Sequence, residues 1–202
     1  MSIPENIDAI LIRIANHPGL MMANIAGEMF TALGIAFLGV MLFTFLRKYG
    51  ERIAMVALGF YLVEAAILAV SNLEVLSLLH ISQAYVTADQ PEYLFTMGKL
   101  AIESTDYAYT LHTLPFAFGA VQFYYLLYFK SKSDIVPRAI SLWGFVTILP
   151  FLVGVPLTML GYEFPFYFYL PYIPFEFVIG VWILCRRFNS SVTSSLSPKT
   201  DT

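Results

Sequence analysis

Residues 29–46 read MFTALGIAFLGVMLFTFL, an unbroken run of 18 residues without a charged side chain. A helix of about 20 mostly apolar residues is long enough to cross the ~30 Å hydrocarbon core of a bilayer. The whole chain agrees with this stretch, because 58% of its 202 residues are hydrophobic and only 12% are charged. A soluble domain carries about 25% charged residues. The sequence therefore predicts an integral membrane protein and excludes an ordinary cytosolic enzyme.

Charge and cysteine content exclude further classes of protein. The 11 Lys and Arg against 14 Asp and Glu give a formal net charge of −3, so the chain has no basic surface for nucleic acid. The high apolar content excludes a disordered chain. A single cysteine, Cys185, excludes an intramolecular disulfide and a multi-cysteine metal site. No cofactor and no nucleic-acid partner are expected.

Four more stretches are apolar and long enough to cross a bilayer. Two of them contain isolated acids, yet a helix that is apolar on every side between such acids is still best placed in lipid. The predicted fold is thus all-α, a polytopic membrane bundle over residues 20–188. It would have about five transmembrane helices, at Met29–Leu46, Ile53–His80, Tyr107–Phe129, Ala139–Tyr162 and Phe164–Cys185.

The placement of Lys and Arg predicts the orientation of this bundle. Nine of the 11 follow the first, third or fifth predicted span, whereas Arg13 and Lys99 lie on the other side. Basic residues are retained on the cytoplasmic side of short loops. The N-terminus is therefore expected outside and the C-terminus inside. Residues 189–202, rich in Ser and Thr, are expected to form a disordered cytoplasmic tail.

Residues 1–19 are expected to form an amphipathic interfacial segment ahead of the first span. Ser2 and Glu5 have the spacing of a capping box, and Pro18 marks the end of the segment. There is no basic region or cleavage site of a signal peptide. We expect a short helix that packs across the bundle as a strap, with one apolar face formed by Ile7, Ile10, Leu11 and Ile14.

The third helix is expected to begin well before the membrane. Asp89 and Glu92 flank Pro91 in the pattern of a helix cap, and the apolar pattern continues to Lys130. About 40 residues at 1.5 Å each would measure about 60 Å, twice the hydrocarbon thickness. The first part of this helix should project outward or lie flat, and Pro115 is the expected kink.

The last third of the chain carries a recognisable set of motifs. They are Tyr125-Leu-Leu-Tyr-Phe-Lys-Ser131, Val136-Pro-Arg138, Phe175-Glu176 six residues before Trp182, and Arg187-Phe188. With Val63-Glu64-Ala65-Ala66, they resemble a family of uncharacterised bacterial multi-pass membrane proteins, domain of unknown function 4386, over roughly residues 25–188. Family members usually have an additional N-terminal span and outer loop. In this chain the short amphipathic segment stands in their place. The resemblance implies a bacterial cytoplasmic (inner) membrane location and carries no established activity.

Two carboxylates are candidates for a central site, because a charged carboxylate in hydrocarbon costs several kcal/mol. Glu64 is twelve residues from Arg52, and Glu176 is ten residues from Arg186. At 1.5 Å per residue both would lie about 15 to 18 Å deep, level with each other. We expect a ligand- or proton-binding site there, or alternatively a packing role in which each acid bonds a neighbouring carbonyl or hydroxyl. The candidate site residues are Glu64, Glu176, Ser71 and Gln122.

A second polar group lies near the outer boundary. Histidine and carboxylate ligands suit zinc, but these residues form no compact motif such as H-E-x-x-H. Solvated side chains are therefore favoured over a metal site. The residues are Glu28, Glu74, His80, Asp106 and His112.

Three functions remain open from the sequence, and a non-catalytic role is favoured over an enzyme. The first is a membrane component such as a sensor, accessory protein or partner subunit, in contact with lipid and with a second copy or another membrane protein. The projecting third helix and the N-terminal segment motivate it. The second is a small carrier or solute-binding protein coupled to protons or cations through Glu64 and Glu176. The third and least favoured is an intramembrane metal hydrolase built on His80, His112 and nearby acids.

Overall fold

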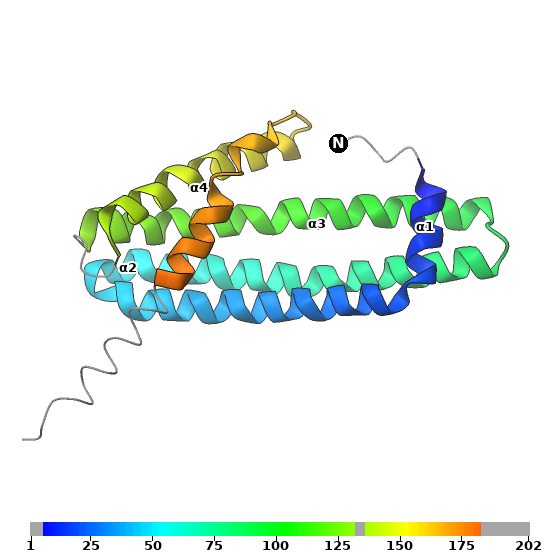
Figure 1. Ribbon diagram of the computed structural model, residues 1–202, viewed down its shortest axis with the longest axis horizontal. Helices are drawn as coiled ribbons and strands as arrows, with labels where there is room; N and C mark the ends of the chain where they lie inside the picture. Colours follow the sequence, from blue (N-terminus) through cyan, green and yellow to red (C-terminus); the bar gives the residue numbers. More distant parts are fainter. Residues whose placement is uncertain (1–5, 132–135, 183–202) are drawn as a thin grey trace, which may run out of the picture.

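A computed structural model describes residues 6–131 and 136–182 of the chain, and within them helix is the only regular secondary structure (Figure 1). This confirms the all-α class. A further helical stretch covers residues 172–182. The elements are α1 (Ile7–Asn16), α2 (Pro18–Thr87), α3 (Glu92–Tyr125), the π-helix η1 (Leu126–Lys130), α4 (Arg138–Met159) and the 3-10 helix η2 (Phe166–Phe168).

Helix α2 consists of two antiparallel halves that meet at Gly50, residues 18–49 and 51–87. The backbone of Gly50 is non-helical, with φ 171° and ψ 79°, and Figure 1 shows the blue and cyan halves side by side. A Cβ at this position would lie 2.8 Å from Cδ2 of Leu126. Glycine therefore lets the turn approach the end of α3 closely, between the first two predicted spans.

The two halves of α2 and helix α3 pack around one aromatic side chain. Tyr61 is 2% exposed and belongs to the main hydrophobic core. A Cβ on Gly39 would lie 2.9 Å from Cβ of Tyr61, and a Cβ on Gly119 would lie 2.6 Å from its Cδ2. The absence of side chains at these two glycines lets the three helices close on the tyrosine ring.

Helix α1 crosses this bundle at the end opposite Gly50 (Figure 1). Leu11 is 0% exposed, and a Cβ on Gly98 of α3 would lie 2.7 Å from its Cδ1 atom. The Tyr85 hydroxyl donates a hydrogen bond to the carboxylate of Asp8. This end has its own core, made of Ile7, Leu11, Leu78, Tyr85 and Leu94.

The helix starts differ from the sequence predictions in detail. The cap of α1 is Asn6, whose side chain accepts a hydrogen bond from the Ala9 amide at 3.1 Å; the predicted box of Ser2 and Glu5 lies outside the described residues. The predicted cap around Pro91 is wrong, because α3 begins without a side-chain cap. Asp89 has φ 60° instead, and this left-handed conformation, which Asp tolerates, makes the turn from α2.

The course of α3 agrees with its predicted extent. It starts at Glu92 and continues through η1 to Lys130, and Pro115 is buried within it. The fifth predicted span, in contrast, is not one helix from Phe164. It opens with η2, and the regular helix occupies residues 172–182. Pro165 and Pro171 explain the interruption, since proline lacks the backbone N–H that a continuous helix needs.

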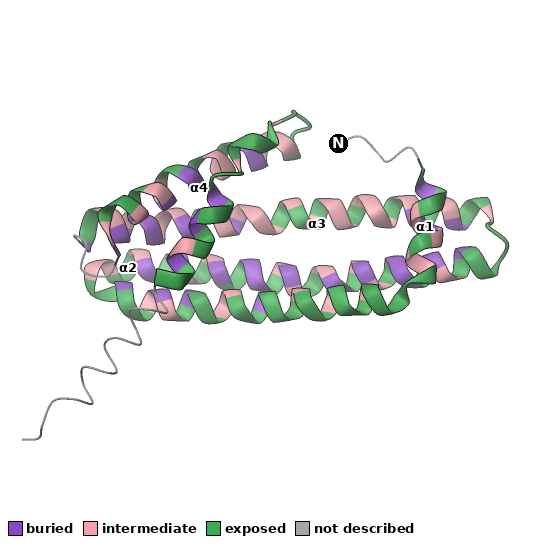
Figure 2. Ribbon diagram, viewed as in Figure 1, coloured by how far each residue is buried: buried purple, intermediate pink, exposed green. Residues whose placement is uncertain are grey.

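Helices α2 and α4 are long and apolar enough to cross a membrane. The first half of α2 is largely exposed along its length (Figure 2). Its outward side chains are large and apolar, with Phe30 79%, Leu33 67% and Phe37 65% exposed. Contiguous apolar surface of this kind needs lipid or a partner to cover it, which is consistent with a bundle that faces lipid.

Candidate functional site

A cavity of about 590 Å³ lies between the helices. It is lined by residues from both halves of α2, from α3, from α4 and from residues 172–182. The described lining includes three carboxylates and one histidine and contains neither Lys nor Arg. The four ionisable acid and histidine side chains are Glu28, Glu64, His112 and Glu176.

Glu64 is the most buried of these acids, with 4% of the residue exposed. It shares one face of the second half of α2 with Tyr61 and Leu68, because residues three and four apart lie on the same side of a helix. Its Oε2 atom is buried and has no hydrogen-bond partner among the described residues. Burial of an unpaired carboxylate oxygen is costly, so this atom calls for a partner.

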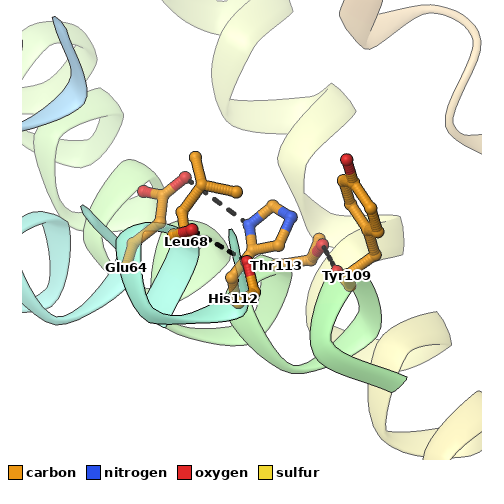
Figure 3. A network of polar contacts seen from close by, with 6 residues as sticks. Glu64, Leu68, Tyr109, His112 and Thr113 are labelled. Carbon is orange, nitrogen blue, oxygen red and sulfur yellow. Dashed lines mark hydrogen bonds and ion pairs between the residues drawn. The ribbon is translucent and has the colours of Figure 1, made fainter. Parts of the chain in front are cut away.

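The nearest cationic candidate is His112 of α3, which points toward Glu64 (Figure 3). The distance from Nδ1 of His112 to Oε1 of Glu64 is 4.0 Å. Charge-assisted hydrogen bonds measure about 2.7–2.9 Å, so these two atoms are not hydrogen-bonded. Nδ1 of His112 is also buried without a hydrogen-bond partner in the described part of the chain.

Glu176 reaches the same cavity from residues 172–182 and is exposed there. Two hydrogen bonds hold this segment in place: the hydroxyls of Tyr124 and Tyr172 are 2.7 Å apart, and Trp143 Nε1 donates to the Pro171 carbonyl at 3.2 Å. The structure thus brings both predicted carboxylates to one cavity, Glu64 on a buried wall and Glu176 on a more open one.

Aromatic rings form much of the remaining wall. The ring of Phe116 packs edge to face on Phe151 and on Tyr172, with centroids 6.2 Å and 5.4 Å apart. Tyr61 lies 6.3 Å from Phe116 by the same measure. These rings were not predicted from the sequence to line a site. The available signal was helical spacing: Tyr61 is three residues before Glu64, Phe116 is four after His112, and Tyr172 is four before Glu176.

Glu28 and His112, which the sequence grouped with outer polar residues, lie at the cavity. The Tyr109 hydroxyl donates a hydrogen bond to the Glu28 carboxylate and so joins α3 to the first half of α2. The rings of Tyr109 and His112 pack with centroids 5.8 Å apart. Glu28 therefore has a partner within the chain, whereas Oε2 of Glu64 has none among residues 6–131 and 136–182.

The other two candidate site residues lie outside the cavity lining. Ser71 donates to the Leu68 carbonyl at 2.8 Å, and Gln122 donates to the Phe118 carbonyl at 2.9 Å. Both are thus bonded to their own helices. Ser71 lines a second groove of about 480 Å³ together with Glu74.

The five residues proposed for a metal site are not brought together. Glu28 and His112 line the cavity, Glu74 lines the second groove, His80 is exposed, and Asp106 lines neither. Among residues 6–131 and 136–182, no group of three or more His, Cys, Asp or Glu side chains could hold a metal ion. The described structure gives no support to the metal hydrolase hypothesis.

Comparison with known proteins identifies the family. The model of the family described as Domain of unknown function (DUF4386) matches residues 1–186, so the chain belongs to that family. The match confirms the resemblance drawn from the motifs. It also includes the amphipathic segment, which we had expected to fall outside the shared region. No curated protein and no solved structure matches the chain.

Proposed function

We propose that the chain is a five-span protein of the bacterial inner membrane that binds a small solute in the cavity, as a carrier or solute-binding protein. The observation that carries the proposal is the position of Glu64, which is 4% exposed and lines the cavity, and whose Oε2 has no hydrogen-bond partner in the described part of the chain. The cavity volume lies within the ~300–1,000 Å³ typical of small-molecule sites.

Helix length and charge support five spans. Both halves of α2, with α3 and α4, exceed the about 20 residues that a bilayer requires, and the apolar segment Phe166–Trp182 would supply the fifth span. Arg47, Lys48 and Arg52 surround the Gly50 turn, at the end of the bundle where Arg138 opens α4 (Figure 1). Under the positive-inside rule this end is cytoplasmic.

The hydrogen bonding of Glu64 favours a ligand over a packing role. An acid that only fixed helix packing would bond its oxygens to a neighbouring carbonyl or hydroxyl. Ser71 and Thr147, which are polar residues within the bundle, instead donate to backbone carbonyls of their own helices. Glu64 lines the cavity, and a solute bound there would supply the partner that its buried Oε2 lacks among the described residues.

The same geometry makes a partner-subunit role less favoured. That hypothesis rested partly on the apolar face of the N-terminal segment. Ile7 is 8% exposed and Leu11 is 0% exposed, because they pack on the chain's own α2 and α3. The segment therefore packs on this bundle, with Ile7 and Leu11 buried and Ile10 and Ile14 half-buried.

A cavity-filling substitution tests the proposal. Gly180 lines the cavity, and a Cβ there would meet nothing within 4 Å, so Gly180→Leu should fill space without a clash. Gly34→Leu is the matched control, since Gly34 is equally unobstructed and does not line the cavity. The purified full chain in lipid nanodiscs would be heated with 2-phenylethylamine, 2-phenylethanol or phenylacetate.

A solute that binds only the folded state raises its stability by about 2.7 kcal/mol at 100 times its Kd. At least one of the three solutes should raise the melting temperature of the wild type and of Gly34→Leu, and raise that of Gly180→Leu much less. If none of them discriminates between the two leucine variants, solute binding in this cavity is wrong.

A further inference from the structure

We infer that the solute is a protonated amine attached to an apolar body, held by Glu64 and Glu176. This inference rests on the proposed function and specifies its ligand class. It follows from three features of the cavity: the sign of its charge, its unpaired acceptor atoms, and its aromatic walls.

The charge of the lining selects a cation. Glu64 and Glu176 lie on the cavity with no Lys or Arg in its described lining. Glu28 is hydrogen-bonded to Tyr109 and Glu176 to Tyr172, so Glu64 is the cavity acid with an unpaired oxygen among the described residues. Opposite charges attract much more strongly in a low-dielectric interior than in water. An anionic solute would meet uncompensated carboxylates, a repulsion that discriminates against it.

The unpaired atoms select a cation that donates hydrogen bonds. Oε2 of Glu64 is an acceptor, and Nδ1 of His112 is an acceptor when the proton resides on Nε2. The 4.0 Å between Nδ1 and Oε1 leaves these neighbours unbonded to each other. A primary ammonium has three N–H donors and could serve Glu64 and His112 together, whereas a quaternary ammonium has none.

The walls select an apolar body. Phe116, Phe151 and Tyr172 form a connected edge-to-face cluster, and Tyr61 and Leu68 continue the apolar surface. Aromatic faces attract ammonium groups and pack against hydrocarbon. An inorganic cation would leave these walls uncovered, and the described residues hold no group of metal ligands. The cavity therefore suits an ammonium group joined to an apolar or aromatic portion.

The test compares isosteric probes on the full chain in nanodiscs. Equilibrium dissociation constants would be measured for 2-phenylethylamine, 2-phenylethanol, phenylacetate and the N,N,N-trimethyl derivative of the amine. We expect the amine to bind at least tenfold more tightly than each of the other three. Glu64→Gln should weaken amine binding at least tenfold and leave 2-phenylethanol binding within twofold, which also shows that the variant is folded. Glu103→Gln, on α3 outside the cavity, is the matched control and should change neither.

The outcomes separate this inference from the proposed function. If 2-phenylethanol or phenylacetate binds as tightly as the amine and Gly180→Leu abolishes that binding, the cavity binds solutes and the amine assignment is wrong. Equal binding of the trimethyl derivative, or full amine affinity in Glu64→Gln, also overturns the assignment. If no probe distinguishes the wild type from Gly180→Leu, the proposed function itself fails.

Discussion

Replacing Gly119 by alanine tests whether close helix contacts fix the position of Tyr61, which lines the cavity. The new Cβ would lie 2.6 Å from Cδ2 of Tyr61 and 3.0 Å from the backbone oxygen of Ala57. The tyrosine ring is 2% exposed and is held on its other side by Gly39, so it has little room to turn away. The oxygen of Ala57 belongs to the backbone, and relief requires α3 to move away from the second half of α2.

Two opposing effects set the size of the change. Overpacking of a closely packed interior costs about 1–3 kcal/mol. Alanine is favoured over glycine inside a helix by about 0.5–1 kcal/mol. We therefore expect Gly119→Ala to lower the free energy of unfolding by roughly 1–2 kcal/mol. Because Tyr61 lines the cavity, its displacement should also weaken solute binding.

Gly59→Ala supplies the control for this experiment. Gly59 lies in the second half of α2, is exposed, and its Cβ would meet nothing within 4 Å. Only the helix preference applies there, so this variant should be as stable as the wild type or up to about 1 kcal/mol more stable. The measurement is reversible denaturant unfolding in mixed micelles, followed by circular dichroism. A Gly119→Ala protein as stable as Gly59→Ala would refute the described packing at Tyr61.

Two further predictions concern the α1 strap. Gly98→Ala should displace the buried Leu11 and destabilise the packing of α1 by about 1 kcal/mol, which corresponds to roughly fivefold faster amide exchange in residues 7–16. Gly27→Ala, whose Cβ would meet nothing within 4 Å, should leave this exchange unchanged. Equal exchange in both variants would contradict the contact. The hydrogen bond to Asp8, with burial, raises the pKa of Tyr85. The stabilisation of α1 by this hydrogen bond should be complete below about pH 10, the usual tyrosine pKa. It should be lost as pH rises through the raised pKa of Tyr85. In the wild type, proteolysis near α1 should increase as pH rises through this range. Tyr85→Phe has no hydroxyl to ionise, so a similar increase with pH in that variant would disprove the role of the Tyr85–Asp8 hydrogen bond.

Much of the architecture could be predicted because helix rise and apolar periodicity act locally. The extent of α3, the amphipathic α1 and the turn near Gly50 follow from runs of apolar residues between basic or turn-forming ones. The left-handed turn at Asp89 could not be predicted from the capping pattern, since Asp serves helix caps and left-handed turns alike. The five-span count stays a prediction, because among the described helices α2 and α4 are the ones both long and apolar enough to cross a membrane.

The sequence indicated which candidate residues lie at the same height along their helices, but not which way their side chains point. Counting residues from a common basic end gives height along a helix, and Glu64 and Glu176 do line one cavity. It does not give the rotation of each helix about its axis. Ser71 and Gln122 therefore face elsewhere, whereas His112 reaches the cavity although the sequence had assigned it to an outer group.

The cavity adjoins the main hydrophobic core, because Leu42, Tyr61 and Tyr172 belong to that core and also line the cavity. On the second half of α2, Tyr61 belongs to the core near Gly50 and Leu78 to the core beneath α1, while Glu64 lies between them. On α3, Leu94 and Ala117 mark the same two cores, and His112 lies between those. The main core thus supplies one wall of the cavity, and Glu64 and His112 extend the lining beyond that core. Substitutions of main-core residues that line the cavity should then alter stability and binding together, whereas Glu64→Gln should change amine binding in a protein that remains folded.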